Sequence, residues 1–110
     1  MEEPIVEPLT LEVFPCHREH DGYHWINVRD GRAYVGKVRC RIWANVLTIC
    51  SIMVFTEFRG RGYGRKAIDL FKDQYGVIVA DRVRHRAIGF WTKMGFRERQ
   101  DGNWEYRRAS

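Results

Sequence analysis

Features that would mark a membrane, secreted or disulfide-stapled protein are missing from the sequence. It has no uninterrupted apolar run of about 18 residues, the minimum for a helix that spans a bilayer. The N-terminus, Met1–Pro4, is acidic and lacks the basic-then-apolar order of a secretion signal. Cys16, Cys40 and Cys50 are odd in number and show no CxxC spacing, which indicates free thiols in a reducing compartment. We therefore expect a cytoplasmic protein without a membrane span.

Repeats, low-complexity tracts and linkers are also absent, so nothing in the sequence marks a domain boundary. A chain of 110 residues with 45% hydrophobic and 30% charged residues has ordinary globular composition. Such a chain can bury a core without disulfides. Residues 1–8 contain two prolines and three glutamates, so we expect a loose arm there and a single domain over residues 9–110.

The net charge is +5, and arginine predominates among the basic residues. Two interpretations stay open. A basic surface attracts nucleic acid or an acidic substrate, whereas arginines can also serve a polyanionic cofactor, because the guanidinium group matches phosphate geometry. No run of five or more basic residues marks a nucleic-acid-binding arm.

The period of the apolar residues predicts four strands in the first half of the chain, at 9–14, 24–29, 32–42 and 46–55. Asp30-Gly31 indicates a hairpin, because a type I′ turn needs positive φ. Ala44-Asn45 is expected to form the next turn. In the third strand, the alternating set expected to face the core is Tyr34, Gly36, Val38, Cys40 and Ile42.

The apolar period changes to that of a helix over residues 63–75, and Gly76 follows where a helix cap would lie. A short strand at 77–80, a second helix at 86–94 followed by Gly95, and a hairpin over 96–107 complete the order. The sequence therefore predicts an α/β fold, a single domain with a mixed, mostly antiparallel sheet and two helices.

A glycine-rich turn, Arg59–Arg65, lies between the fourth strand and the first helix. Main-chain N–H groups of such a turn can point into one concavity, and a helix N-terminus adds partial positive charge. The segment is therefore a candidate anion site, to which its three arginines can add charge-assisted bonds. It matches neither the dinucleotide-binding GxGxxG nor the P-loop pattern, and an ordinary strand-to-helix turn with surface arginines is the alternative.

Two motifs together resemble the GCN5-related N-acetyltransferase (GNAT) family. Arg59, Gly62 and Gly64 match its Gln/Arg-x-x-Gly-x-Gly/Ala signature, and Ala87–Phe96 matches its alanine-aromatic helix that ends in Gly-Phe. The resemblance covers residues 46–96 and implies a minimal acyl-CoA N-acyltransferase fold. It also implies that acetyl-CoA is the co-substrate, entering a gap where the strands that hold Val54 and Val77 splay apart.

The family's roles can be transferred to matching positions. Main-chain groups near Met53 and Val54 would bond the pantetheine and the acetyl carbonyl, and the glycine turn would hold the diphosphate. Arg84 takes the place of a frequent asparagine and either contacts the cofactor or lies at the surface. The implied cofactor contacts are Met53, Val54, Arg59, Gly60, Arg61, Gly62, Tyr63, Gly64, Arg65, Arg84, Ala87, Phe90 and Trp91.

The implied reaction is direct attack of an amine on the thioester, which needs the amine neutral. Trp91 stands where many members have a tyrosine acid, and its indole N–H only donates a hydrogen bond. Glu57 and His85 are the candidate bases, with a solvated loop residue and a surface or capping histidine as the alternatives. Tyr23 and Tyr106 are further candidates, for which burial in the core is the alternative.

Only Cys16–Tyr23 is available where the family usually has two helices, so the acceptor groove should be open. This favours a protein, a peptide or another large acceptor, or a site completed by a second subunit. The alternative function is a non-catalytic module that binds CoA or nucleic acid. Cys16, His17, His20 and His24 do not match an established zinc spacing, and a polar loop is favoured over a metal site. Trp25, Trp43 and Trp104 either stack on bases or fill the core.

Overall fold

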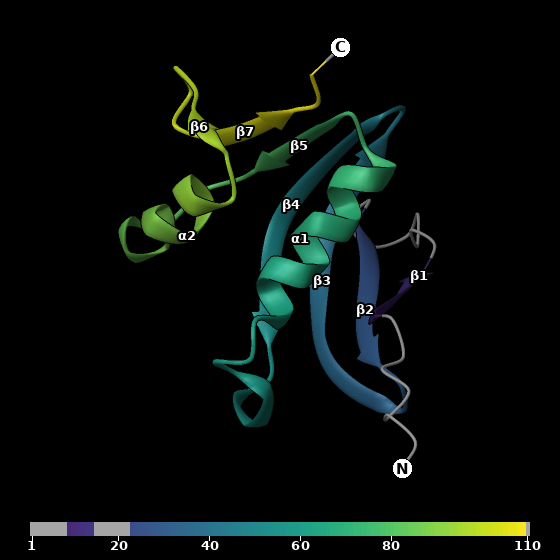
Figure 1. The fold of residues 1–110 in the computed structure, drawn as a ribbon. Helices are drawn as coiled ribbons and strands as arrows, with labels where there is room; N and C mark the ends of the chain where they lie inside the picture. The colour runs from purple at the N-terminus through teal and green to yellow at the C-terminus, as the bar shows by residue number, and fades with distance from the viewer. Residues whose placement is uncertain (1–8, 15–22, 110) are drawn as a thin grey trace.

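A computed structural model describes residues 9–14 and 23–109, which form one seven-stranded sheet with two α-helices (Figure 1). The strands are β1 (Leu9–Phe14), β2 (His24–Asp30), β3 (Ala33–Trp43), β4 (Val46–Val54), β5 (Val77–Ala80), β6 (Arg97–Glu98) and β7 (Trp104–Arg107). The helices are α1 (Tyr63–Gln74) and α2 (Ile88–Lys93), preceded by the 3₁₀ turns η1 (Thr56–Phe58) and η2 (His85–Ala87). The predicted fold class is confirmed.

The strand order is β1-β2-β3-β4-β5-β7-β6, and every neighbouring pair is antiparallel except β4 and β5. Strands β1 to β4 form a meander, and α1 is the crossover that makes β4 and β5 parallel. The predicted arm at 1–8 and loop at 16–22 lie outside the described residues. No described helix is long and apolar enough to cross a membrane.

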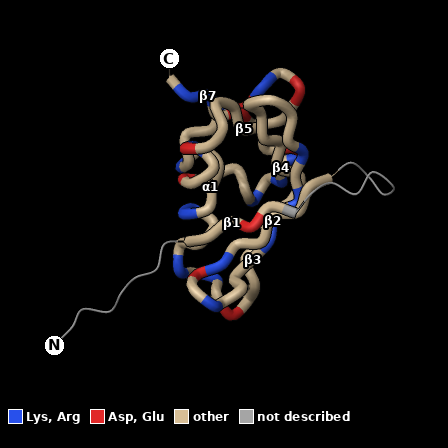
Figure 2. Tube along the Cα trace, turned by 90° about the vertical axis from the view of Figure 1, so that its right-hand side faces the viewer, with Lys and Arg blue, Asp and Glu red and all other residues tan. Residues whose placement is uncertain are grey.

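The core lies on the sheet face that α1 covers. Ala67, Ile68 and Phe71 form the buried side of α1 and belong to one cluster with the buried side chains of β2 to β5. Figure 2 views the sheet from its β1 edge and places α1 on one side of β1 to β3. On the other side, Trp25 and Met53 are 38% and 45% exposed, so over β2 to β4 this second face is open among the described residues.

A β-bulge changes the predicted core face of β3. Val28 pairs with Gly36 but Arg29 pairs with Tyr34, so Val35 is the extra residue. Val35 is fully buried, whereas Tyr34 turns to the open face, where its hydroxyl donates to Asn27 at 2.9 Å. The prediction for Tyr34 was therefore wrong, while Gly36, Val38 and Cys40 are buried as predicted and Ile42 packs against the core.

Two glycine predictions differ in outcome. Gly95 has φ of 85°, and the bonds from Gly95 N to Thr92 O and from Phe96 N to Trp91 O form a Schellman cap at the end of α2, as expected. Gly76 is not a left-handed cap, because the chain leaves α1 at Tyr75 in an extended conformation. Gly76 instead lies against Asn45, whose Oδ1 accepts from Gly76 N at 3.0 Å.

The hairpins form where they were predicted, although their turns differ in detail. Asp30 pairs with Ala33, and of the two turn residues only Gly31 has positive φ, whereas a type I′ turn needs it at both. The turn at Ala44-Asn45 is confirmed by the pairing of Trp43 with Val46. The predicted second helix is divided into η2 and α2.

The approach of β3 to β4 should not tolerate a side chain at Gly36. A Cβ there would lie 2.3 Å from the carbonyl oxygen of Met53, so Gly36→Ala must push the strands apart. We expect it to lower the free energy of unfolding by about 1–3 kcal/mol, measured by urea denaturation. Gly89→Ala is the matched control, because nothing lies within 4 Å of a Cβ at that helical position. Equal midpoints for Gly36→Ala and the wild type would contradict the close approach.

Candidate functional site

The two parallel strands separate halfway along β4. The last β4–β5 pair is Ile49 with Ala80, closed by a bond from Asp81 N to Ile49 O at 2.9 Å. Beyond it, β4 continues to Val54 and keeps only β3 as a neighbour. The splay expected for this pair of strands is therefore present, and it opens one flank of β4 along residues 50–54.

A second bulge decides which main-chain groups face this opening. Cys40 pairs with Ile49 and Arg39 with Ser51, so Cys50 is the extra residue on β4. Phe55 N bonds to Val35 O at 2.9 Å, and in a ladder alternate residues face the same neighbour. The N–H and C=O groups of Ile52 and Val54 therefore turn away from β3 toward the opening. Met53 contributes its side chain there instead.

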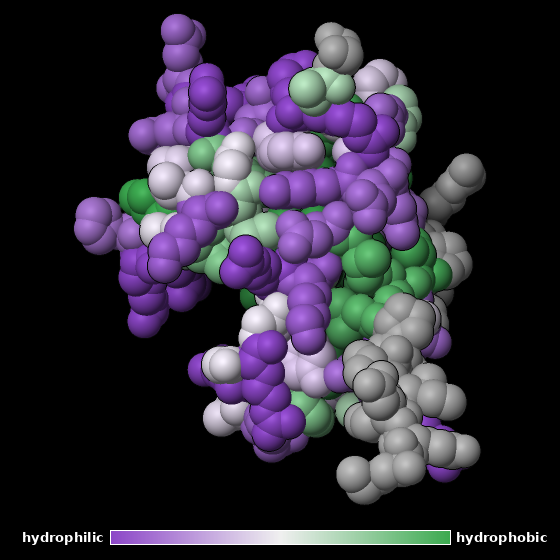
Figure 3. All heavy atoms as spheres, viewed as in Figure 1, coloured by the Kyte–Doolittle hydropathy of each residue, from purple (hydrophilic) through white to green (hydrophobic). Residues whose placement is uncertain are grey.

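The opening is a cleft of about 480 Å³ between the second half of β4 and the segment that leads from β5 into α2. In the space-filling view it corresponds to the notch in the outline beside α2 (Figure 3). Of the residues that the sequence suggested, Met53, Arg84, Ala87 and Trp91 line the cleft. Lining residues that sequence reasoning missed include Cys50, Ser51, Asp81, Arg82 and Arg86.

The glycine turn lies at the end of this half of β4 and presents free amides. Gly60 and Gly62 have φ of 79° and 82°, a region that L side chains seldom adopt. Gly62 is the N-cap of α1 and makes no side-chain cap bond. The first helical bond runs from Lys66 N to Gly62 O at 3.0 Å, so the amides of residues 63–65 have no carbonyl partner within the helix.

Side chains fix the turn to its surroundings. Arg59 Nε donates to Val54 O at 3.1 Å, which binds the turn to the last residue of β4. Tyr63 donates its hydroxyl to Asp30 Oδ2 at 2.5 Å, and this hydrogen bond, with partial burial, raises the pKa of Tyr63. A Cβ on Gly64 would lie 3.6 Å from the ring of Phe90, so α2 reaches the start of α1.

The opposite wall is built on aromatic packing. Trp91 is 5% exposed. Its ring lies edge-on to that of Phe90, with the ring centroids 5.0 Å apart, and packs against Phe96, with the centroids 4.7 Å apart. Trp91 therefore serves both the core and the wall of the cleft. Tyr106 packs beside Phe96 with Lys72 over its ring at 4.7 Å, and it is not among the residues that line the cleft.

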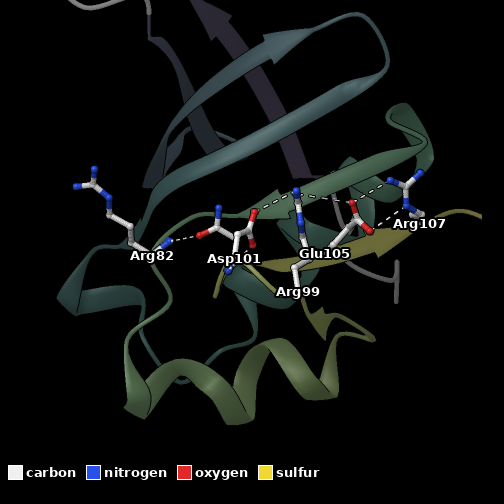
Figure 4. Close-up of polar contacts among 6 residues, drawn as sticks. Arg82, Arg99, Asp101, Glu105 and Arg107 are labelled. Atoms are coloured by element: carbon white, nitrogen blue, oxygen red, sulfur yellow. Dashed lines mark hydrogen bonds and ion pairs between the residues drawn. The ribbon is translucent and has the colours of Figure 1, made fainter.

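The chain between β5 and η2 is held by the C-terminal hairpin (Figure 4). Arg82 adopts a left-handed conformation with φ of 53°, and its N–H donates to Asn103 Oδ1 at 3.2 Å. Asp101 supports Asn103 through a bond of 3.0 Å from Asn103 N, and Arg99 pairs with Asp101 at 3.1 Å. This polar network fixes the position at which Asp81 and Arg82 meet the cleft.

The candidate bases from the sequence do not lie in the cleft. Glu57 is exposed in η1 and His85 is exposed at the start of η2, and neither is among the lining residues. Their catalytic roles stay predictions. Asp81 is the carboxylate among the described residues that line the cleft. Its position directly after the short strand 77–80 was the signal available in the sequence, since parallel strands meet a site at their C-terminal ends.

The remaining candidates fall elsewhere. Cys16, His17 and His20 lie outside the described residues, and the described part of the chain holds no group of three potential metal ligands. Trp43 is 81% exposed and does not fill the core, whereas Trp104 packs against it.

The described cysteines, Cys40 and Cys50, are free, as expected. Burial raises the pKa of the Cys40 thiol to about 12, with a smaller contribution from Cys50. Burial also raises the pKa of Cys50, and the neighbouring carboxylate of Asp81 adds to this shift. Cys50 and Asp81 thus face each other across the point where the strands separate.

Asp81→Asn should make Cys50 more reactive. Removing the carboxylate lowers the pKa of Cys50, so at pH 8 more of it is thiolate, the form that reacts with iodoacetamide. We expect faster alkylation of Cys50 and no change at buried Cys40, followed by mass spectrometry of the separate peptides. An unchanged rate at Cys50 would show that the two groups are not neighbours.

Comparisons with known proteins agree with this geometry. The sequence model of the acetyltransferase (GNAT) family matches residues 2–96. An uncharacterized N-acetyltransferase of Halalkalibacterium halodurans is 38% identical over 50 residues, which are 46% of this chain and 29% of that protein. The chain thus matches under a third of this relative's length.

Solved structures share the fold. E. coli YhhK, determined with coenzyme A, superposes with a TM-score of 0.69 at 17% identity and covers 93% of this chain and 100% of its own. An acetyltransferase from Thermus thermophilus gives a TM-score of 0.61 at 23% identity over 81% of this chain and 65% of its own. Because the family model matches residues 2–96, most of the chain, the chain belongs to the GNAT acetyltransferase family.

Proposed function

We propose that this chain is an acetyl-CoA-dependent N-acetyltransferase that transfers the acetyl group to an amine by direct attack. The observation that carries the proposal is the separation of β4 from β5 after Ile49, which leaves strand main chain exposed beside a helix start with free amides. A long ligand with a diphosphate at one end and an amide-containing arm fits these two features together. YhhK of E. coli and YlbP of Bacillus subtilis, which share the fold, were both solved with coenzyme A.

The residues present fit such a co-substrate. Unpaired amides of residues 63–65 would hold the diphosphate at the positive end of α1, with Arg61 and Arg65 beside it. Main-chain groups of Ile52 and Val54, which have no β5 partner, would form hydrogen bonds to the amides of the pantetheine arm. The carbonyl of Val54 already accepts a hydrogen bond from Arg59. Ala87, Phe90 and Trp91 would form the opposite wall.

Acetyl-CoA supplies an electrophilic thioester, and the chain supplies positioning and polarity. A strand N–H of Ile52 or Val54 would stabilise the negative charge that develops on the acetyl oxygen. Asp81 at the separation point would attract and orient the acceptor amine. Trp91 is buried and carries no acidic proton, so the sulfur would leave as thiolate, which a thiol with a pKa of about 8.5 permits, and it would take up through solvent the proton that the attacking amine loses.

Gly62→Val should strongly weaken acetyl-CoA binding. Valine at φ of 82° is strained, so the turn must change shape and its amides lose their common direction. Gly62→Asn is the matched control, because asparagine tolerates the left-handed region and no atom crowds a Cβ there. By calorimetry we expect at least a tenfold weaker affinity for the valine variant and near wild-type affinity for the asparagine variant, with circular dichroism confirming that both fold. Equal affinity in the two variants would refute the diphosphate site.

Asp81→Asn should lower kcat/KM for the amine about tenfold or more, since a hydrogen bond between charged groups contributes about 1.5–3 kcal/mol. Asp69→Asn is the control, because Asp69 is an exposed carboxylate on α1. Both variants are compared by mass-spectrometric acetylation assays, with acetyl-CoA affinity measured in parallel. If wild-type protein binds acetyl-CoA yet acetylates no amine in a broad panel, the chain is a non-catalytic CoA-binding module instead.

A further inference from the structure

A row of cations runs along the open face of the sheet beside the cleft. Lys37, Arg39 and Arg41 alternate on β3 and share the face opposite the core, and we call them the basic row. Lys37 is the register partner of Met53 and Arg39 that of Ser51, and both partners line the cleft. Because paired strands lie about 4.8 Å apart, the basic row borders the cleft.

The basic row has no acidic partner among the described residues. Lys37 Nζ lies over Trp25, 5.1 Å from the ring centroid. The Cζ atoms of Arg39 and Arg41 lie over Tyr23, 4.8 and 4.5 Å from its ring centroid. Arg41 also donates to the Tyr23 hydroxyl at 2.9 Å, while Arg39 Nε has no hydrogen-bond partner. Aromatic rings orient these cations without neutralising them.

Two other charged groups on the sheet combine both signs, unlike the basic row. Glu12 on β1 pairs with Arg29 on β2. Glu105 on β7 pairs with Arg107 at 2.9 Å and with Arg99 at 3.8 Å. These two carboxylates therefore already have basic partners, whereas Lys37, Arg39 and Arg41 form no ion pair with any of the residues that the structure describes.

The wall of the cleft opposite β4 is basic as well. Arg82, Arg84 and Arg86 line it, and the side chain of Arg82 is 92% exposed. Asp81 directly precedes Arg82 on the same wall, and its carboxylate is 4.0 Å from Arg82 Nε. A carboxylate in a cleft with cations on both sides suits a ligand with an ammonium group at its centre and negative charges on either side of it.

We propose, on the basis of the proposed acetyltransferase function, that the acceptor amine is carried by an acidic protein segment lying extended across the basic row. Alternate side chains of an extended segment are about 6.6 Å apart, the same repeat as Lys37, Arg39 and Arg41, so its carboxylates can meet all three. Polyamines and basic segments are repelled by the basic row and by the arginines of the opposite wall. Nucleic acid matches the charge but carries no aliphatic amine to acetylate.

Three lysine peptides of one length test this acceptor class. Their flanking residues are Glu in the first, Gln in the second and Arg in the third, and acetylation is followed by mass spectrometry. Wild-type protein should show the lowest KM for the Glu peptide and the highest for the Arg peptide. The variant Lys37→Gln/Arg39→Gln/Arg41→Gln should raise KM for the Glu peptide roughly tenfold, since each exposed ion pair contributes a two- to threefold factor. Arg97→Gln, an exposed cation on β6, is the control and should keep the preference.

Binding measurements separate this proposal from the function on which it rests. Acetyl-CoA affinity is measured first by calorimetry, and its absence overturns the acetyltransferase function itself. If acetyl-CoA binds but the three peptides show equal KM, or none is acetylated, the acidic acceptor is wrong and the co-substrate site stands. Fluorescence anisotropy then compares the labelled Glu peptide with a single-stranded oligonucleotide of equal charge. Tighter binding of the oligonucleotide, lost in the triple variant, would assign the basic row to nucleic acid and overturn the proposal.

Discussion

The end of β4–β5 pairing at Ile49 and Ala80 is the constraint on which the rest of the site depends. A parallel pair that continued to Val54 would satisfy the main chain of β4 on both flanks and leave no cleft. The extra residue at Cys50 falls at this point and reverses the alternation of β4. As a result, Ile52 and Val54 direct main-chain groups away from β3 on the flank that β5 has left, while Ser51 and Met53 reach the cleft from the open face.

The polar network of the C-terminal hairpin keeps the strands apart. Arg82 occupies a left-handed conformation that costs an arginine about 1 kcal/mol or more, so something must hold it there. Asn103 accepts its N–H, and the bonds among Arg99, Asp101 and Glu105 fix the hairpin that carries Asn103. The position of Asp81 therefore depends on residues far along the chain, none of which lines the cleft.

Sequence reasoning found the parts of the site that depend on local pattern. The glycine turn and the Gly95 cap were predicted because a positive φ strongly favours glycine, and the elements followed from the period of their apolar residues. Both bulges were missed, since neither Val35 nor Cys50 differs in type from its neighbours and register depends on the partner strand. Tyr34 was consequently assigned to the wrong face. Asp81 was missed for a related reason, because its nearness to Cys50 arises only when distant strands pair.

The open face of the sheet connects the fold to the choice of acceptor. A face covered by helices would be apolar, yet here β2 and β3 alternate buried aliphatic side chains with Trp25, Lys37, Arg39 and Arg41 on the uncovered side. These residues cannot serve the core, and the three cations lie over aromatic rings without an ion pair among the described residues. Since the same face supplies Ser51 and Met53 to the cleft, any acceptor that reaches the thioester from this side must cross the cations first. The basic face therefore attracts or repels the acceptor before acetyl transfer takes place. Selectivity for the acceptor would then come from this electrostatic interaction and not from the shape of a closed pocket.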